Sequence, residues 1–202
     1  MKRNPKFNVI GVVDRHPGCA VELAKKLGFR RSAETDTLAQ VSWLDEIDAI
    51  TIGTPPFTHH ALIAEALSLN KHVLTEKPFT MSPTESDDLI NRRDAAKKQL
   101  CVVHNFQFAR STRRLQADLA SRELGKINGL SAVQFGNPNR RLPAWYNELP
   151  LGLFYDESPH LLYLLRNVAP SPLVLKSALM HRSTRGEATP ARIDAHYSFN
   201  LD

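Results

Sequence analysis

Short strand-like runs alternate with helix-like segments through the first half of the sequence. The runs are rich in β-branched residues and end at polar or proline-containing positions. We predict strands at residues 7–13, 47–52, 72–75 and 100–104, and helices at 20–27, 60–69 and after Ser82. Strands separated by amphipathic helices are typical of βαβ units, so this pattern predicts a parallel, doubly wound sheet.

The ends of the predicted helices carry residues that commonly stop or start a helix. Gly28 follows the first helix and Asn70 follows the second. The third helix opens with Ser82-Pro83-Thr84-Glu85, where the serine can cap, the proline suits the first helical position and the glutamate completes a capping box. These boundaries support an ordered succession of strands and helices.

The sequence pattern changes from about residue 126. A strand is predicted at 127–135, a polar, proline-rich loop at 136–150, a leucine-rich helix at 156–166, and strands at 173–180 and 192–201. No helix separates the last two strands, which favours an open antiparallel or mixed sheet. We therefore expect two domains, at residues 1–124 and 125–202, with the boundary near Leu124-Gly125.

The composition is that of an ordinary globular protein. The chain has 202 residues, of which 42% are hydrophobic and 23% charged, and no apolar run approaches the ~20 residues of a membrane span. The net charge of +5 (26 basic minus 21 acidic residues) comes without the long basic stripe typical of nucleic-acid binders. Cys19 and Cys101 lie far apart, which indicates reduced thiols and a cytoplasmic location. We expect neither a nucleic-acid partner nor a membrane partner.

Polar residues and prolines gather where the predicted strands end. In a parallel sheet, ligands bind outside the carboxyl ends of the strands. The residues at these ends are Asp14, Thr54-Pro55-Pro56, Glu76-Lys77-Pro78 and Asn105. The sequence therefore predicts a binding site along one edge of the sheet.

Asp14 ends the first predicted strand, where a carboxylate can accept hydrogen bonds from a ribose. It could equally cap a turn, and both interpretations stay open on this residue alone. A dinucleotide-binding fingerprint places a G-x-G-x-x-G loop about 20 residues earlier, and the chain has no room for one before Asp14. Either the nucleotide-binding interpretation is wrong or the chain begins inside the domain.

Two further strand ends offer chemistry, each with a plainer alternative. Pro55 and Pro56 turn the backbone out of the sheet, and a cofactor could lie against that loop near His59; otherwise the loop is ordinary and its histidine solvated. Lys77 could donate to a substrate oxygen or could be an exposed lysine in a turn. The Lys77-Pro78 bond could be cis, a feature that is rarely accidental.

Asp156 and His160 are four residues apart at a predicted helix start, so they project from one face. With a lysine nearby, the histidine could accept a proton from a hydroxyl group while the aspartate and the lysine orient the substrate and stabilise charge. The pair could equally form a salt bridge, and a lone histidine on a leucine-rich helix is usually structural.

These motifs together resemble one family. In order, VVDR, TPPFTHH, NKHVLTEKPF, CVVHNFQF and GLFYDESPH are similar to motifs of the Gfo/Idh/MocA oxidoreductases, relatives of glucose–fructose oxidoreductase and inositol dehydrogenase. The similarity runs from residue 8 to at least residue 165, and HVLTEKPF followed about eighty residues later by D-x-x-x-H is its most specific part. The resemblance implies an α/β fold class, with a truncated Rossmann-type parallel sheet followed by an α+β domain whose open sheet is mainly antiparallel.

The resemblance also implies roles for individual residues. Lys77 would be the active-site lysine, Asp156 its acidic partner and His160 the proton acceptor, in a hydride transfer between NAD or NADP and a hydroxyl or carbonyl group of a small sugar- or cyclitol-like substrate. The residues implied for the cofactor are Asp14, Arg15, Thr54, Pro55, His59, Glu76, Lys77, Pro78 and Asn105. The predicted substrate residues are Lys77, Arg140, Arg141, Trp145, Tyr155, Asp156 and His160, and no metal ligands are predicted. Arg140, Arg141 and Trp145 are included because their loop precedes the helix that carries Asp156 and His160.

Two of these assignments leave alternatives open. Asp14 favours NAD because a carboxylate repels a 2′-phosphate, whereas the neighbouring Arg15 keeps NADP possible. Arg140 and Arg141 could bind a carboxylate or phosphate of the substrate, or could belong to an ordinary basic surface loop.

The sequence also departs from the family's pattern. The glycine-rich loop is absent and the family's second domain usually continues beyond a point like Asp202, so we expect an internal piece of a longer oxidoreductase. A sheet without its first strand exposes unpaired edges, so we expect low stability or a homo-oligomer. The alternative functions are a non-catalytic nucleotide-sensing or partner-binding member of the fold, an inactive fragment, and a redox-neutral, NAD-assisted glycoside cleavage.

Overall fold

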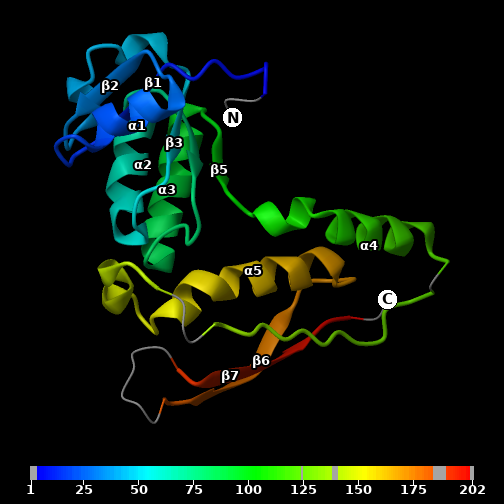
Figure 1. The fold of residues 1–202 in the computed structure, drawn as a ribbon. Coiled ribbons are helices and arrows are strands. Elements are labelled where there is room, and N and C mark those ends of the chain that lie inside the picture. The colour runs from blue at the N-terminus through cyan, green and yellow to red at the C-terminus, as the bar shows by residue number, and fades with distance from the viewer. Residues whose placement is uncertain (1–3, 124, 138–140, 184–189, 201–202) are drawn as a thin grey trace. The chain divides into compact units, whose positions relative to one another are not determined.

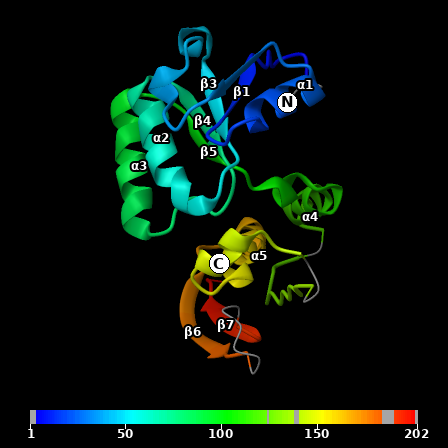
Figure 2. The same cartoon turned by 60° about the vertical axis from the view of Figure 1, so that its left-hand side comes forward.

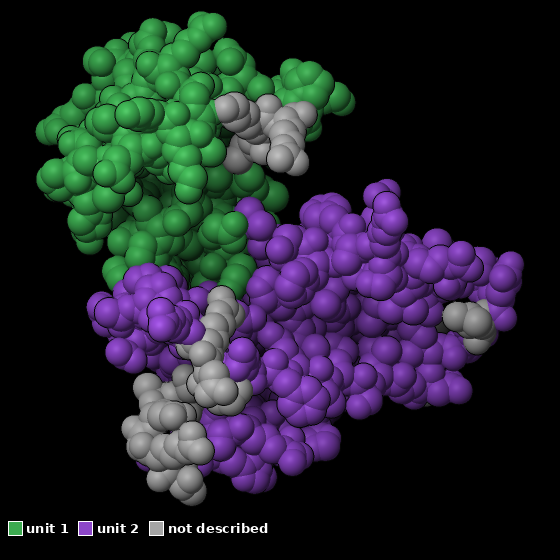
Figure 3. Space-filling model, in the orientation of Figure 1, with its two compact units in different colours: residues 1–102 green, residues 103–202 purple. Residues whose placement is uncertain are grey.

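The computed structural model describes residues 4–123, 125–137, 141–183 and 190–200. The chain forms two compact units, residues 1–102 and residues 103–202 (Figure 3). The first unit carries parallel strands and the second an antiparallel pair, which confirms the predicted α/β class. The two units divide between Val102 and Val103, and the domain boundary near residues 124–125 stays a prediction.

The strands of the first unit are short and form two separate parallel sheets. They are β1 (Gly11–Asp14), β2 (Arg31–Glu34), β3 (Ala49–Ile52), β4 (His72–Thr75) and β5 (Leu100–Val102). β1 pairs with β2, while β3, β4 and β5 are hydrogen-bonded in that order. The register places Asp14 opposite Glu34 and Ile52 opposite Thr75. Within each sheet, the carboxyl ends of the strands therefore lie side by side.

Three longer helices of the first unit cover these sheets. They are α1 (Cys19–Leu27), α2 (His59–Ser68) and α3 (Pro83–Ala96). Figures 1 and 2 show α2 and α3 side by side along the β3–β4–β5 sheet, and α1 beside β1 and β2. Ile63 and Leu89, from α2 and α3, are both 0% exposed in the main hydrophobic cluster. Full burial of such a side chain stabilises the fold by about 1.5–3 kcal/mol.

The helix ends follow the residues that the sequence marks. Gly28 terminates α1 in the left-handed conformation (φ 64°), which glycine adopts without steric cost. The hydroxyl group of Ser82 accepts a hydrogen bond from the N–H of Glu85 (3.2 Å), as a capping box requires. The Glu85 carboxylate accepts from the N–H of Met81 (2.8 Å), one residue before the usual capping-box partner. Local sequence thus sets where these helices begin and end.

A second hydrophobic cluster lies beside β1 and β2. It is built from Val41, Trp43 and Leu44. Gly11 permits a close approach here, because a Cβ atom at this position would lie 2.6 Å from the carbonyl oxygen of Arg31 and 2.8 Å from the Trp43 ring. The start of β1 is therefore packed too tightly for a side chain.

The second unit combines helices with one β-hairpin. Short 3₁₀ segments span Asn105–Phe108 and Ala144–Glu148, the longer helices are α4 (Arg110–Ser121) and α5 (Leu153–Val168), and the strands are β6 (Val174–His181) and β7 (Arg192–Ser198). β6 and β7 pair antiparallel, as the lack of an intervening helix predicts. Among the described residues, no helix is both long and apolar enough to span a bilayer.

Several predicted boundaries are wrong. The predicted strand at 7–13 starts only at Gly11, because its partner β2 reaches no further than Arg31 at that end. Residues 127–135 form no strand, and Phe135 is 89% exposed. An alternating apolar pattern forms a strand only when a partner strand accepts its backbone hydrogen bonds and packs against its side chains. β2 and α4 were not predicted, because β2 has a polar sequence and α4 buries none of its residues. α5 begins at Leu153, three residues before the predicted start at Asp156.

Candidate active site

The turn after β4 carries the lysine and proline singled out in the sequence. The Lys77-Pro78 peptide bond is cis. The backbone N–H of Glu76 donates to the carbonyl oxygen of Ile52 (2.9 Å), which extends the β3–β4 pairing by one step. Lys77 is half-buried and Pro78 is buried. Backbone hydrogen bonds between β3 and β4 therefore fix the chain as far as Glu76, the residue before Lys77.

His59, the first residue of α2, ties this turn to the loop after β3. Its side chain is 0% exposed. Nδ1 lies 2.9 Å from the carbonyl oxygen of Pro78, and Nε2 lies 2.8 Å from that of Thr54. Both partners only accept, so a neutral imidazole can donate to one of them at a time, whereas a protonated ring can donate to both. His59 is thus a buried link between two strand ends and not a solvated loop residue.

Asp14 lies at the carboxyl end of β1, and its side chain contacts His16, two residues further along the chain. Its Oδ1 accepts from the backbone N–H of His16 (2.8 Å) and lies 3.0 Å from the His16 ring. The backbone N–H is the main reason that the pKa of Asp14 lies below its usual value, and the ring of His16 and the charge of Arg15 act in the same direction. Asp14 therefore stays ionised near neutral pH.

Glu34 adds a second carboxylate beside Asp14. The two residues are register partners at the ends of β2 and β1. Glu34 Oε1 accepts from the backbone N–H of Gly18 (2.6 Å), at the start of α1. The sequence analysis missed Glu34 because the short polar strand that carries it was not predicted. This sheet edge is acidic at two adjacent positions.

In the second unit, Asp156 is buried in the first turn of α5. It is 4% exposed, and its Oδ2 accepts from the hydroxyl group of Tyr146 (2.8 Å), which is itself 8% exposed. Tyr146 lies in the 3₁₀ segment that precedes α5, where the Trp145 ring stacks on it with a centroid distance of 4.2 Å. The proline-rich loop therefore supplies a buried donor to the aspartate.

His160 lies one turn further along α5 and is 7% exposed. Its Nδ1 lies 2.9 Å from the hydroxyl oxygen of Tyr163. The same oxygen accepts from the backbone N–H of Phe106 (3.0 Å), and the Phe106 ring packs against the His160 ring at a centroid distance of 4.4 Å. The ring of His104 stacks on Tyr163, also at 4.4 Å. His160 is therefore enclosed by aromatic side chains from two segments.

Burial changes the pKa of two residues near His160, namely Tyr163 and His104. It raises the pKa of Tyr163 above its ordinary value, and the Phe106 N–H opposes this only in part. Burial also lowers the pKa of His104, and the positive charge of Arg166 acts in the same direction. Both side chains are therefore uncharged near neutral pH.

Four more of the predicted site residues belong to the second half of the sequence. Asn105 begins the 3₁₀ segment before α4 and is exposed, as is Arg141, whereas Tyr155 in α5 is half-buried. Arg140 lies outside the described residues. Lys77 belongs to the first unit, and Asp156 and His160 to the second. Their action in a single site stays a prediction.

Sequence reasoning missed the tyrosines that contact the predicted catalytic pair. Tyr163 follows His160 by three residues on one helix, a spacing that places the two side chains together. This spacing could have identified Tyr163. Tyr146 is separated from Asp156 by a turn, so no periodicity connects these two residues.

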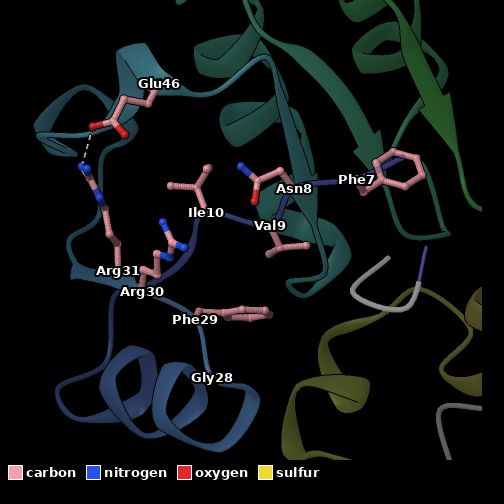
Figure 4. Close-up of a pocket in the computed structure, with 9 residues that line it drawn as sticks. All are labelled: Phe7, Asn8, Val9, Ile10, Gly28, Phe29, Arg30, Arg31 and Glu46. Carbon is pink, nitrogen blue, oxygen red and sulfur yellow. Dashed lines mark ion pairs between the residues drawn. The ribbon is translucent and has the colours of Figure 1, made fainter. Parts of the chain in front are cut away.

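A cavity of about 300 Å³ lies at the opposite end of β1 from Asp14 (Figure 4). Residues 7–10 and 28–31 line it together with Glu46, which pairs with Arg31 at 2.6 Å. None of the predicted site residues that the structure describes lines this cavity. In the described part of the chain, no group of three or more His, Cys, Asp and Glu side chains is placed to hold a metal ion.

Two known proteins with similar sequences are sugar-nucleotide oxidoreductases by name. The chain is 36% identical over 94 residues to UDP-N-acetylglucosamine 3-dehydrogenase of Acidithiobacillus ferrooxidans (46% of this chain, 28% of that protein). It is 29% identical over 187 residues to dTDP-3,4-didehydro-2,6-dideoxy-alpha-D-glucose 3-reductase of Saccharopolyspora spinosa (87% of this chain, 52% of that protein). The chain thus spans about half or less of the length of these relatives.

Solved structures share the fold. An oxidoreductase from Agrobacterium radiobacter, crystallised with NAD⁺, L-tartaric acid and magnesium, superposes with a TM-score of 0.79 at 19% identity, covering 97% of this chain and 57% of that one. A family model described as an oxidoreductase family with an NAD-binding Rossmann fold matches residues 1–105, about half of the sequence. The chain therefore belongs to the Gfo/Idh/MocA oxidoreductase family.

Proposed function

We propose that the chain carries the cofactor and catalytic residues of an NAD(P)-dependent oxidoreductase. It transfers a hydride between the nicotinamide and a hydroxyl or carbonyl carbon of a sugar- or cyclitol-like substrate. The observation that carries this proposal is the buried pair Asp156 and His160 on one helix, in a family member whose Lys77-Pro78 turn is tied down by His59. Residues 1–124 form the cofactor domain and residues 125–202 begin the substrate domain.

The strand ends of the first unit fit the polar part of a dinucleotide. Both hydrogen bonds described for the side chain of Asp14 end on Oδ1, so Oδ2 can still accept from a ribose hydroxyl group. Arg15, Thr54, Pro55, His59, Glu76, Pro78 and Asn105 complete the proposed cofactor contacts. The paired carboxylates of Asp14 and Glu34 disfavour a 2′-phosphate through charge repulsion, so we expect NAD to bind better than NADP.

Each of the three catalytic residues has a separate task. His160 accepts the hydroxyl proton during oxidation, since a neutral imidazole is a suitable base near neutral pH. Asp156, held by Tyr146, orients the substrate, and the Lys77 ammonium group stabilises charge on its oxygen. The bound nicotinamide supplies the hydride acceptor.

The names of the two relatives suggest a narrower class of substrate. Both the dehydrogenase and the reductase are named for reaction at position 3 of a hexose. We therefore expect oxidation or reduction at carbon 3 of a hexose derivative. Arg141 and Trp145, before α5, and Tyr155 within it are the proposed contacts to the rest of the substrate, and we include Arg140 on the sequence alone.

We place the enzyme in the cytoplasm as a homo-oligomer with a small-molecule substrate. Cys19 and Cys101 are both free thiols, as a reducing compartment favours. Apolar side chains of the β6–β7 hairpin, among them Leu175 and Leu179, are more than half exposed, which supports association with another copy.

The first experiment is a titration of the chain with NADH and with NADPH, followed by nicotinamide fluorescence. Saturable binding, tighter for NADH, is expected. A screen of hexoses, nucleotide sugars and cyclitols with NAD⁺ then tests turnover. Absence of binding for both cofactors would refute the proposal for this chain and would favour a non-catalytic or inactive protein.

Two lysines at opposite ends of β4 give a matched comparison. Lys77→Ala should lower turnover by a factor on the order of 10² or more, because the developing charge on the substrate oxygen loses its cation. Lys71→Ala, at the other end of the strand, should leave turnover unchanged. Equal losses in both variants would refute a catalytic role for Lys77.

A further inference from the structure

Phe106 is a large apolar side chain that is exposed directly beside the buried His160. Its ring packs against the imidazole at a centroid distance of 4.4 Å, with the two planes tilted by 32°. His160 is 7% exposed, whereas Phe106 is 46% exposed. The phenyl ring therefore covers one side of the imidazole and still presents apolar surface next to it.

The backbone of Phe106 is held from two sides. Its N–H donates to the hydroxyl oxygen of Tyr163 (3.0 Å), a side chain that is itself buried. Its carbonyl oxygen accepts from the hydroxyl group of Thr112 (2.9 Å) and from the backbone N–H of Ala109 (3.1 Å). The half-exposed ring is therefore kept beside His160 by the anchoring of its backbone.

The direction of hydrogen bonds to an imidazole determines where the body of a substrate would lie. An imidazole nitrogen exchanges its proton in the plane of the ring, along its lone pair. A hydroxyl group that reaches His160 therefore brings the carbon atoms that carry it to the rim of the imidazole. The Phe106 ring, which packs over one side of that imidazole, lies next to this position.

We propose that Phe106 is a specificity-determining residue, whose ring contacts a C–H face of the substrate while the reacting hydroxyl group meets His160. This inference rests on the proposed function of His160 as proton acceptor. It specifies the kind of molecule that is recognised, namely a saturated ring with hydroxyl groups around its edge and C–H groups on one face. Aromatic side chains commonly line ligand sites in this way. A hydroxyl group projecting from that face would lose water against the phenyl ring without gaining a partner, so such an isomer binds less well.

Fluorine NMR tests the contact directly. Para-fluorophenylalanine is incorporated at position 106 and, in a matched sample, at position 108, where the native phenylalanine is 70% exposed. D-glucose and myo-inositol serve as probes, since each presents C–H groups on the face of a saturated ring. At least one probe should shift the resonance at position 106 saturably and leave that at position 108 in place. No shift at position 106, or equal shifts at both positions, would overturn the proposal.

This experiment is separate from the test of the proposed function, because it needs neither cofactor nor turnover. Binding of NADH together with an unshifted resonance at position 106 would refute the Phe106 contact alone. A saturable shift at position 106 without NADH binding would support the contact and refute the proposed hydride transfer.

Kinetics with a substrate found in the screen distinguish a substrate contact from a purely structural role. Phe106→Leu should raise KM about fourfold with kcat little changed, because apolar contact equivalent to roughly one CH₂ group is lost. Phe106→Tyr keeps the ring and should retain the wild-type KM, and so should Phe108→Leu. A fall in kcat at unchanged KM would mean that the ring only holds His160 in place, and would contradict the proposal.

Discussion

Replacing His59 by phenylalanine would remove both ring nitrogens from a side chain that is 0% exposed. The carbonyl oxygens of Pro78 (2.9 Å) and Thr54 (2.8 Å) flank the ring, and a neutral imidazole donates to one of them at a time, so the variant removes one donor. A buried acceptor left without a donor costs about 1–3 kcal/mol. The cost is largest if Pro78, which is buried, loses the donor, and smaller for Thr54, which is exposed and can be partly rehydrated. We therefore expect a loss of about 2 kcal/mol in the free energy of unfolding.

The loss would be measured by urea unfolding, followed through the fluorescence of Trp43, which is buried in the first unit. With a slope of about 1–3 kcal/mol per M, a loss of about 2 kcal/mol lowers the midpoint of unfolding by about 0.7–2 M. His59→Gln should recover part of the loss, because an amide can donate to one of the two carbonyls.

His60→Phe is the matched control, because it removes a neighbouring histidine whose side chain is 34% exposed and pairs with Asp88. A partly exposed ion pair contributes at most about 1 kcal/mol, so this variant should unfold close to the wild type. Equal midpoints for His59→Phe and the wild type, or equal losses in the two histidine variants, would refute the argument that His59 links the two strand ends.

Three further predictions concern other parts of the chain. Gly11→Ala should lower the free energy of unfolding by about 2 kcal/mol in urea titrations, because its Cβ would meet the backbone of Arg31, whereas Gly53→Ala, which meets open space, should not lower it. Asp14→Asn should lower the ratio of the NADPH to the NADH dissociation constant about tenfold, because one charge that repels the 2′-phosphate is removed. Fluorescence titration measures both constants, and an unchanged ratio would exclude a role of Asp14 in the choice between NAD and NADP. Burial lowers the pKa of His104, so the unfolded chain binds its proton more readily and stability should fall as the pH drops below about 6.5. Thermal unfolding between neutral and mildly acidic pH would test this, and His104→Phe should flatten that part of the profile.

The fold could be predicted where local patterns and helix ends coincide. The strand at 72–75 and the helix that begins after Ser82 match the structure, since each is marked by residues that act within one turn. The polar strand β2 could not be predicted, because it exists only by pairing with β1. For the same reason, residues 127–135 have a strand pattern and form no strand. Hydrogen-bonded partners, which lie far apart in sequence, decide such segments.

The candidate site shows the same division. The sequence alone determined which residue types stand at the strand ends and at the start of α5, because motif order and the i, i+4 spacing of Asp156 and His160 are local properties. Only the tertiary structure decided their surroundings. The link from His59 to Pro78, the donor from Tyr146 to Asp156 and the Phe106 backbone that fixes Tyr163 all join distant segments. Burial and hydrogen-bond partners depend on which segments pack together, and periodicity carries no information about that.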